Sequence, residues 1–154
     1  MLGIDPGTIQ SGYVILDNNR VTSSGTLSNP EMLALAAGYS GTIAIEMVAS
    51  YGMAVGKEVF ETVRWIGRFQ QASKDPEAVR LVYRRDVKIH LCGSARATDQ
   101  NIRAAIIDAF GMGKDTAVGR KSAPGPLYAV KGHAWSALAV ALTAVADRSF
   151  GGVT

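Results

Sequence analysis

Residues 1–16 read Met-Leu-Gly-Ile-Asp-Pro-Gly-Thr-Ile-Gln-Ser-Gly-Tyr-Val-Ile-Leu, and they predict the start of a β-sheet. The apolar run that ends in Asp5-Pro6-Gly7 is typical of a short strand stopped by a turn. Residues 12–16 predict a second strand. After an Asn-rich turn, residues 20–27 predict a third, partly polar strand at an edge of the sheet. Tight turns between these strands predict an antiparallel meander.

Beyond the meander, helical and strand patterns alternate. The expected elements are a helix over 30–38, a buried parallel strand over 42–46, a helix over 53–71, a strand over 79–83, helices over 85–92 and 99–110, a mobile basic loop over 111–131 and a last helix over 132–148. This order predicts an α/β protein. Its mixed five-stranded sheet, flanked by helices, forms a single domain over residues 1–154.

The helix expected over 53–71 carries a wide apolar arc. Val55, Val59, Val63, Ile66 and Gln70 lie on one stripe, and the arc is widened by Trp65 and Phe69. An arc of this width predicts a helix that packs on the core and also contacts another subunit.

Composition limits the class of protein. The chain has 154 residues, of which 47% are hydrophobic and 19% charged, so one domain can bury a core without a disulfide or metal staple. Cys92 is the single cysteine, which fits a reducing compartment. There is no apolar run of ~18 residues and no basic leader before one, so no membrane span or signal peptide is expected. We therefore expect a cytoplasmic protein of a bacterial or phage-infected cell, with an organellar matrix as the other option.

Charge is distributed unevenly along the chain. Residues 1–63 contain two basic and six acidic residues, whereas residues 64–154 contain fourteen basic and seven acidic residues. This asymmetry fits a polyanion-binding surface beside a carboxylate site. Taken alone, a net charge of +3 slightly favours an ordinary solvated surface.

Two lone acids lie in apolar strands. Asp5 ends the first strand, and Glu46 follows Ile43-Ala44-Ile45 in the fourth. An ionised carboxylate is costly to bury without a partner, and hard oxygen ligands suit Mg²⁺, so together the two acids predict a shared divalent cation. Either acid alone could instead cap a helix or pair with an arginine. Gly7 and Gly12 would let the backbone approach a bulky ligand closely.

The last helix begins with polar groups on an otherwise apolar sequence. His133 and Ser136 lie one helical turn apart, near the sheet edge where Asp5 and Glu46 would emerge. A lone histidine at this position is by default a core or cap residue. Its expected place beside the two acids favours a functional role.

Four motifs in order resemble the RuvC-type Holliday junction resolvases of the RNase H-like superfamily. The motifs are residues 2–8 with Gly12-Tyr13, Ala44-Ile45-Glu46, Val87-Lys88 with residues 93–97, and residues 133–139. Together they span almost the whole chain. The first motif alone would be weakly specific, whereas the four in sequence are a strong signal.

The resemblance implies an RNase H-like fold, a homodimer and paired nicking of opposed strands in four-way DNA junctions. It implies Mg²⁺, with Mn²⁺ as a substitute, and no nucleotide cofactor. Asp5 would bridge the metals, Glu46 would hold one of them, and His133 would be a ligand or a proton-transfer group. Relatives of this kind encoded by phages also imply cleavage of other branched DNA.

The chain departs from the family pattern at three positions. Ser136 stands where the family has a metal-binding aspartate, Asp99 where it often has a lysine, and Ala49 where it often has an aromatic wedge. As a ligand, Ser136 would be weak. Tyr51, helped by Met53, could take over stacking at the junction centre.

Another acid could replace the missing ligand. The candidates are Glu58, Glu61, Asp99 and Asp115. For the first two we favour ordinary pairing on the helix surface with Lys57 and Arg64.

Basic side chains in the predicted loops would contact DNA as a group, although any single one is more often a solvated charge. The predicted DNA-binding residues are Tyr51, Lys88, Arg96, Lys114, Arg120, Lys121 and Lys131. Arg84 and Arg85 could anchor Asp86 or a subunit interface.

Two other functions compete with that of a nuclease. The absence of an acid at Ser136 favours a non-catalytic junction-binding protein. The Asp-x-Gly-Thr turn also occurs in sugar-kinase and actin-like ATPases, but those need two such domains, and 154 residues provide one.

Overall fold

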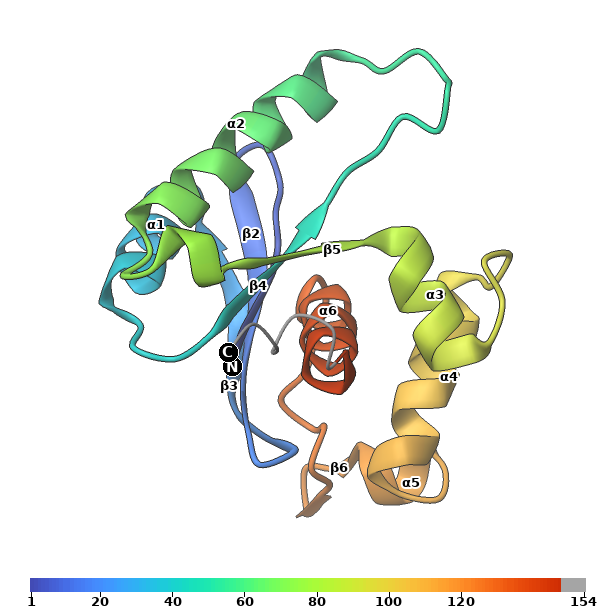
Figure 1. Ribbon diagram of the computed structural model, residues 1–154. Helices are drawn as coiled ribbons and strands as arrows, with labels where there is room; N and C mark the ends of the chain where they lie inside the picture. Colours follow the sequence, from blue (N-terminus) through green and yellow to red (C-terminus); the bar gives the residue numbers. More distant parts are fainter. Residues whose placement is uncertain (148–154) are drawn as a thin grey trace.

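A computed structural model describes residues 1–147 and contains the mixed five-stranded sheet predicted from the sequence (Figure 1). The strands are β1 (Leu2–Asp5), β2 (Gln10–Asp17), β3 (Arg20–Ser28), β4 (Ile43–Met47) and β5 (Arg80–Tyr83). Their order is β3-β2-β1-β4-β5, with β3 at one edge as expected. The meander is antiparallel, whereas β4 pairs in parallel with both β1 and β5. The two strands that carry Asp5 and Glu46 are therefore neighbours.

Helices cover both faces of the sheet. On one face, α1 (Asn29–Gly38) and α2 (Lys57–Ala72) pack over a core that includes Leu2, Ile4, Ile43 and Ile45. On the other, α6 (Ala134–Ala146) packs against the sheet, and α3 (Arg84–Cys92) and α4 (Asp99–Phe110) lie beside it (Figure 1). Strand side chains alternate between faces, so Gly3, Asp5, Ala44 and Glu46 share the face toward α6.

The helix predicted over 53–71 begins later than expected. Tyr51 and Gly52 have positive φ angles of 49° and 81°, and the helix starts only after the extended Gly56. The buried residues of α2 are Thr62, Ile66 and Phe69, so Ile66 and Phe69 of the predicted arc are buried, and Thr62 joins them. These three residues, spaced i, i+4 and i+7, face α1 and β4. Val63 lies off this stripe and is partly exposed.

The two helices that follow β5 end and begin as predicted. Gly93 closes α3 in the left-handed conformation, with φ 70°. Thr98 caps α4, and its hydroxyl accepts a hydrogen bond from the Asn101 N–H while the Asn101 side chain accepts one from the Thr98 N–H. A short 3₁₀ turn, η1 (Pro76–Ala78), precedes β5.

The segment 111–131 is not the irregular loop that was predicted. It contains the short helix α5 (Lys114–Ala117) and a two-stranded ribbon of β6 (Gly119–Arg120) and β7 (Ala123–Pro124). Ala117, Leu127 and Val130 are buried in the core on the α6 side. These three buried apolar residues fix the segment against the core. They lie among glycines and prolines, which is why the sequence pattern predicted an irregular loop instead.

The last helix was expected over 132–148 and spans Ala134–Ala146, with His133 at its N-cap. Arg148 lies outside the residues that the structure describes. Within residues 1–147, no helix has the length and apolar character needed to cross a bilayer.

Candidate active site

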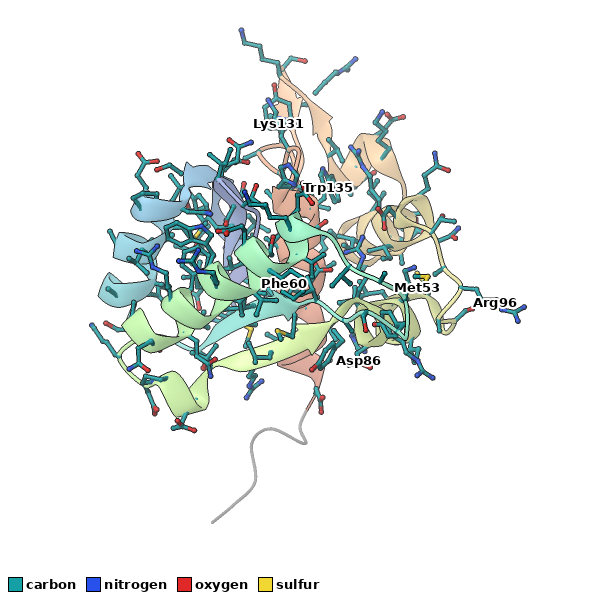
Figure 2. All side chains as sticks on the ribbon, turned by 90° about the horizontal axis from the view of Figure 1, so that it is seen from above. Met53, Phe60, Asp86, Arg96, Lys131 and Trp135 are labelled. Atoms are coloured by element: carbon teal, nitrogen blue, oxygen red, sulfur yellow. The ribbon has the colours of Figure 1, made fainter. Side chains whose placement is uncertain are left out.

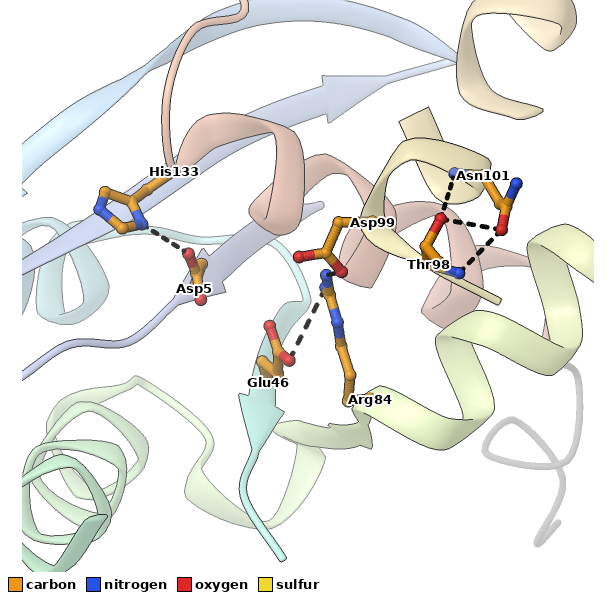
Figure 3. A network of polar contacts seen from close by, with 7 residues as sticks. All are labelled: Asp5, Glu46, Arg84, Thr98, Asp99, Asn101 and His133. Carbon is orange, nitrogen blue, oxygen red and sulfur yellow. Dashed lines mark hydrogen bonds and ion pairs between the residues drawn. The ribbon is translucent and has the colours of Figure 1, made fainter. Parts of the chain in front are cut away.

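Asp5 and Glu46 emerge side by side from two central strands. In the parallel pairing of β1 and β4, Gly3 lies opposite Ala44 and Ile4 opposite Ile45, so the next residues along are Asp5 and Glu46. Both carboxylates lie on the α6 face, and their side chains are only 18% and 15% exposed. The predicted convergence of the two acids on one side of the sheet is confirmed (Figure 3).

The first turn of α6 lies directly against the meander because two strand residues are glycines. A Cβ atom at Gly3 would lie 2.4 Å from the Ala137 carbonyl oxygen, and one at Gly12 would lie 2.6 Å from the His133 backbone. This close approach brings His133 Nδ1 to 3.2 Å from Asp5 Oδ2. The histidine itself stays open to solvent, with a side chain that is 63% exposed.

Gly7 and Gly12 were expected to make room for a ligand, and the structure corrects this. At Gly12 the space is filled by the backbone of His133. At Gly7 a Cβ atom would lie 2.4 Å from the Gln10 carbonyl oxygen. Both glycines therefore allow two segments of the chain to pack closely together next to the site.

A buried hydrogen-bond network fixes the turn that follows Asp5. The Ser11 hydroxyl donates to Asn29 Oδ1 at 2.7 Å and accepts from the Gly7 N–H at 3.2 Å. The Asn29 amide donates to the Gly7 carbonyl at 2.9 Å. Because these groups are satisfied within the chain, the end of β1 is held rigidly where Asp5 projects.

The two carboxyl groups share one electrostatic environment. Burial raises the pKa of Glu46 to about 7, and repulsion from Asp5 adds to this, while Arg84 opposes it. Burial also raises the pKa of Asp5, against the opposing effects of His133, Glu46 and Arg84. A proton on Glu46 would be hydrogen-bonded to Asp5. The two carboxyl groups are thus harder to ionise than isolated ones, and a nearby cation would favour their charged form.

The donor set fits a divalent cation of the magnesium type. Mg²⁺ in proteins commonly uses one or two carboxylates, several waters and phosphate oxygens of the substrate, and Asp5 and Glu46 supply the carboxylates. Within residues 1–147, no group of three Asp, Glu, His or Cys side chains is arranged to hold a metal. His133 lies on Asp5 rather than between the acids, so its role as a third ligand stays a prediction.

Ser136 lies in the wall of a cavity of about 300 Å³ between α4 and α6. Arg84, Asp99, Arg103 and Trp135 also line this cavity. The Arg103 guanidinium stacks over the Trp135 ring, 4.4 Å from its centroid, as in a cation–π contact. Ser136 as a metal ligand stays a prediction as well.

Arg84 is a site residue that the sequence reasoning did not assign. It opens α3 directly after β5, and its guanidinium lies between two acids. Nη1 is 3.8 Å from Glu46 Oε1, and Nη2 forms an ion pair with Asp99 Oδ1 (Figure 3). Of the candidate replacement acids, Asp99 therefore approaches the site, through Arg84.

The other candidate acids lie elsewhere. Glu61 pairs with Arg64 at 3.2 Å on the surface of α2, which is the ordinary helix pairing that we favoured. Glu58 is exposed in the first turn of α2, and Asp115 is exposed on α5.

Two of the predicted DNA-binding residues lie together beside the site. Tyr51 and Lys88 line a second cavity, of about 380 Å³, with Arg84, Arg85 and Ala95. The Tyr51 side chain sits on a turn and is exposed, as stacking on DNA would require. The neighbouring Met53 is exposed too.

The remaining predicted DNA-binding residues are spread over the surface. Lys131 lies near Trp135 at the start of α6 and packs over the Tyr128 ring at 5.6 Å, whereas Arg96 lies on a distant loop between α3 and α4 (Figure 2). Lys114, Arg120 and Lys121 are exposed on α5 and the ribbon. Contacts of these residues with DNA stay predictions.

Solved structures with a similar fold include two of a RuvC protein. A Thermus thermophilus RuvC structure superposes with a TM-score of 0.62 over 97% of this chain and 92% of that chain, at 19% sequence identity. The chain has a RuvC-like fold. A second structure, of T. thermophilus RuvC in complex with a Holliday junction substrate, gives a TM-score of 0.61 at 21% identity and covers 92% of this chain and 90% of that chain.

The RuvC-like fold confirms the architecture that the four sequence motifs predicted. Neither a protein-family model nor a curated protein sequence matches the chain. The likeness to known proteins is therefore one of fold.

Proposed function

We propose that this chain is a divalent-metal-dependent, structure-selective DNA endonuclease that resolves four-way junctions by paired nicking of opposed strands. The observation that carries the proposal is the convergence of Asp5 and Glu46 on one face of the sheet, beside His133. A paired carboxylate site on a strand end of this fold suits metal-assisted phosphodiester hydrolysis.

Asp5 and Glu46 would hold Mg²⁺, for which Mn²⁺ could substitute. Bound there, the cation would activate a water and stabilise charge on the attacked phosphate. Asp5 orients the His133 ring through Nδ1, which leaves Nε2 to hold or take up a proton on the open side of the site. Ser136, one turn further along α6, would contribute at most a neutral oxygen.

A branched DNA substrate is supported by the fold and by charge. The RuvC of Thermus thermophilus has been solved with a Holliday junction substrate. In this chain the basic residues fall mainly in the second part of the sequence, and Arg84, Arg85 and Lys88 line one cavity beside the acids. Such charges bind DNA phosphates with little dependence on sequence, so forks and other branches are expected substrates too.

Paired nicks call for two sites, which we attribute to a homodimer. Phe60 and Val63 on α2 are 61% and 37% exposed, and they lie one helical turn apart, away from the core. An exposed apolar stripe of this kind supports a two-fold interface, and a two-fold axis would present two equivalent sites to opposed strands.

A non-catalytic junction-binding protein is the second candidate. It is favoured by Ser136 in place of an acid and by the lack of a three-ligand metal group within residues 1–147.

In either case the lone Cys92 and a DNA partner support a reducing compartment, either the cytoplasm of a bacterial or phage-infected cell or an organellar matrix.

The deciding experiment compares nicking and binding of a synthetic four-way junction. In Mg²⁺ or Mn²⁺, the natural chain is expected to nick opposed strands. Asp5→Asn and Glu46→Gln should each lose at least ~100-fold in rate while they still bind the junction. Asp17→Asn, at an exposed acid that ends β2, is the matched control and should cut normally. Tight binding by the natural chain without nicking in either metal would favour the second candidate.

A further inference from the structure

The guanidinium of Arg84 lies at the edge of the carboxylate pair. It is held between Glu46 and Asp99, and the side chain is 25% exposed. Burial would lower the pKa of Arg84, but Glu46 and Asp99 outweigh this and raise it. The guanidinium therefore stays charged beside the two acids.

One nitrogen of this cation lacks a hydrogen-bond partner. Nη1 of Arg84 is buried, and its approach to Glu46 Oε1, at 3.8 Å, is too long for a hydrogen bond. Among the buried side-chain nitrogens and oxygens of residues 1–147, it alone is left without one. A buried charged donor without an acceptor is unfavourable, so the Arg84 guanidinium would gain from a further acceptor that reaches it.

Arg84 also stands between two cavities, since it lines both of them. On one side lies the cavity of about 300 Å³ with Arg103 and Ser136, and on the other that of about 380 Å³ with Arg85 and Lys88. Asp99 is the single acid in the two linings. A polyanion that passes from one cavity to the other would cross Arg84 within reach of the carboxylate pair.

We propose that Arg84 binds a DNA backbone phosphate beside Asp5 and Glu46, and that Asp99 holds the guanidinium in position until the phosphate replaces it. The inference rests on the proposed function, from which it takes DNA as the ligand. Arginine presents two parallel N–H groups to a phosphate and carries a charge that it cannot lose. The Asp99 side chain is 80% exposed, so its ion pair with Arg84 can be exchanged at low cost.

This role makes Asp99 a positioning residue that competes with DNA. Removing its charge should free Arg84 and strengthen junction binding. If Arg84 served only to neutralise Glu46, the effect of removing Asp99 on junction binding would be the same with and without Arg84. The two roles therefore predict different results for the same exposed substitution.

The test measures equilibrium binding of a fluorescent four-way junction, without divalent metal, as a function of salt concentration. Arg84→Met should weaken binding about tenfold and lower the salt slope by about one phosphate contact. Arg84→Lys should keep the slope and recover part of the affinity. Asp99→Asn should tighten binding, and this gain should disappear in the double variant Asp99→Asn/Arg84→Met. Arg20→Met, at an exposed arginine that begins β3, is the control and should bind as the natural chain does.

The inference is overturned if Arg84→Met, folded by circular dichroism, keeps the natural affinity and salt slope. Should Arg84→Met fail to fold, Asp99→Asn decides, because unchanged or weaker binding by that variant also overturns it. A natural chain that binds the junction but never nicks it contradicts the proposed function alone, because the binding measurements on the variants still test the role of Arg84. A natural chain that does not bind the junction contradicts both.

Discussion

Gly12 of β2 lies directly against the backbone of His133, and a Cβ atom at residue 12 would come within 2.6 Å of the His133 carbonyl oxygen. This contact sets the depth at which the first turn of α6 meets the sheet. It thereby fixes the 3.2 Å separation between His133 Nδ1 and Asp5 Oδ2. The geometry of the site thus depends on a residue that carries no side chain.

Gly12→Ala should therefore damage both stability and the site. The added methyl group has to push α6 away from β2, at a cost of about 1–3 kcal/mol in the free energy of unfolding, and His133 would move with it. Gly67→Ala is the matched control, because Gly67 is exposed on α2 with open space around it, and it should stabilise by up to ~1 kcal/mol. Urea unfolding and junction nicking measure the two effects. Equal stability of the two variants would contradict the account.

The raised pKa of Glu46 predicts how stability depends on pH. Burial and Asp5 raise this pKa from 4.5 to about 7, so between these values the folded chain holds a proton that the unfolded chain has released. The contribution of Glu46 to the free energy of unfolding should therefore be greatest below about pH 4.5. It should fall by about 3 kcal/mol in all as pH rises toward 7.

Urea unfolding of the metal-free chain at a series of pH values checks this. Glu46→Gln removes the titrating group and should flatten the fall, whereas Glu77→Gln, an exposed acid in η1, should leave it as it is. The same fall in Glu46→Gln as in the natural chain would show that another group is responsible. Added Mg²⁺ should stabilise the natural chain more at about pH 8 than at about pH 6, because the cation has to displace the proton.

Ser136→Asp should raise the affinity for divalent cations. A carboxylate one turn after His133, on the helix that packs against the sheet face of Asp5 and Glu46, adds a hard, charged ligand and is expected to strengthen Mn²⁺ binding at least about tenfold. Calorimetric titration of Mn²⁺ measures the change. Ser122→Asp, on the exposed ribbon, controls for added charge alone. Identical Mn²⁺ affinities of the two variants would mean that residue 136 does not face the cation.

Phe60→Glu should disrupt the proposed homodimer. Phe60 is 61% exposed on α2, and burial of such a side chain in an interface is worth about 1.5–3 kcal/mol, so the dimer dissociation constant should rise at least ~10-fold. Sedimentation equilibrium measures it. Met112→Glu, at a residue that is 95% exposed before α5, is the control. A dimer unaffected by Phe60→Glu would place the interface elsewhere.

The central part of the site could be predicted from the sequence because strand alternation is local information. Leu2 and Ile4 mark the apolar face of β1, which assigns Asp5 to the other face, and Ile43 and Ile45 do the same for Glu46. The parallel pairing of β1 with β4 then brings the acids together. Apolar strands and short turns are enough to predict this much.

Arg84 was missed because its partners are distant in sequence. Its neighbours Glu46 and Asp99 come from β4 and α4, so the contact exists only once β5 lies beside β4. A signal was available, since an arginine directly after a parallel strand lies at the carboxyl end of the sheet, where the acids emerge. The buried anchors of segment 111–131 were missed for a similar reason, as glycines and prolines around Leu127 hide its burial.

The claim that Asp5 and Glu46 together bind one divalent cation is tested most directly by crystals of the natural chain soaked in Mn²⁺. Anomalous diffraction at the manganese edge should show a peak between the two carboxylates, within ligand distance of an oxygen from each, and Glu46→Gln crystals treated in the same way should lose it. A peak that avoids either acid, or no peak at a concentration that supports nicking, would contradict the account.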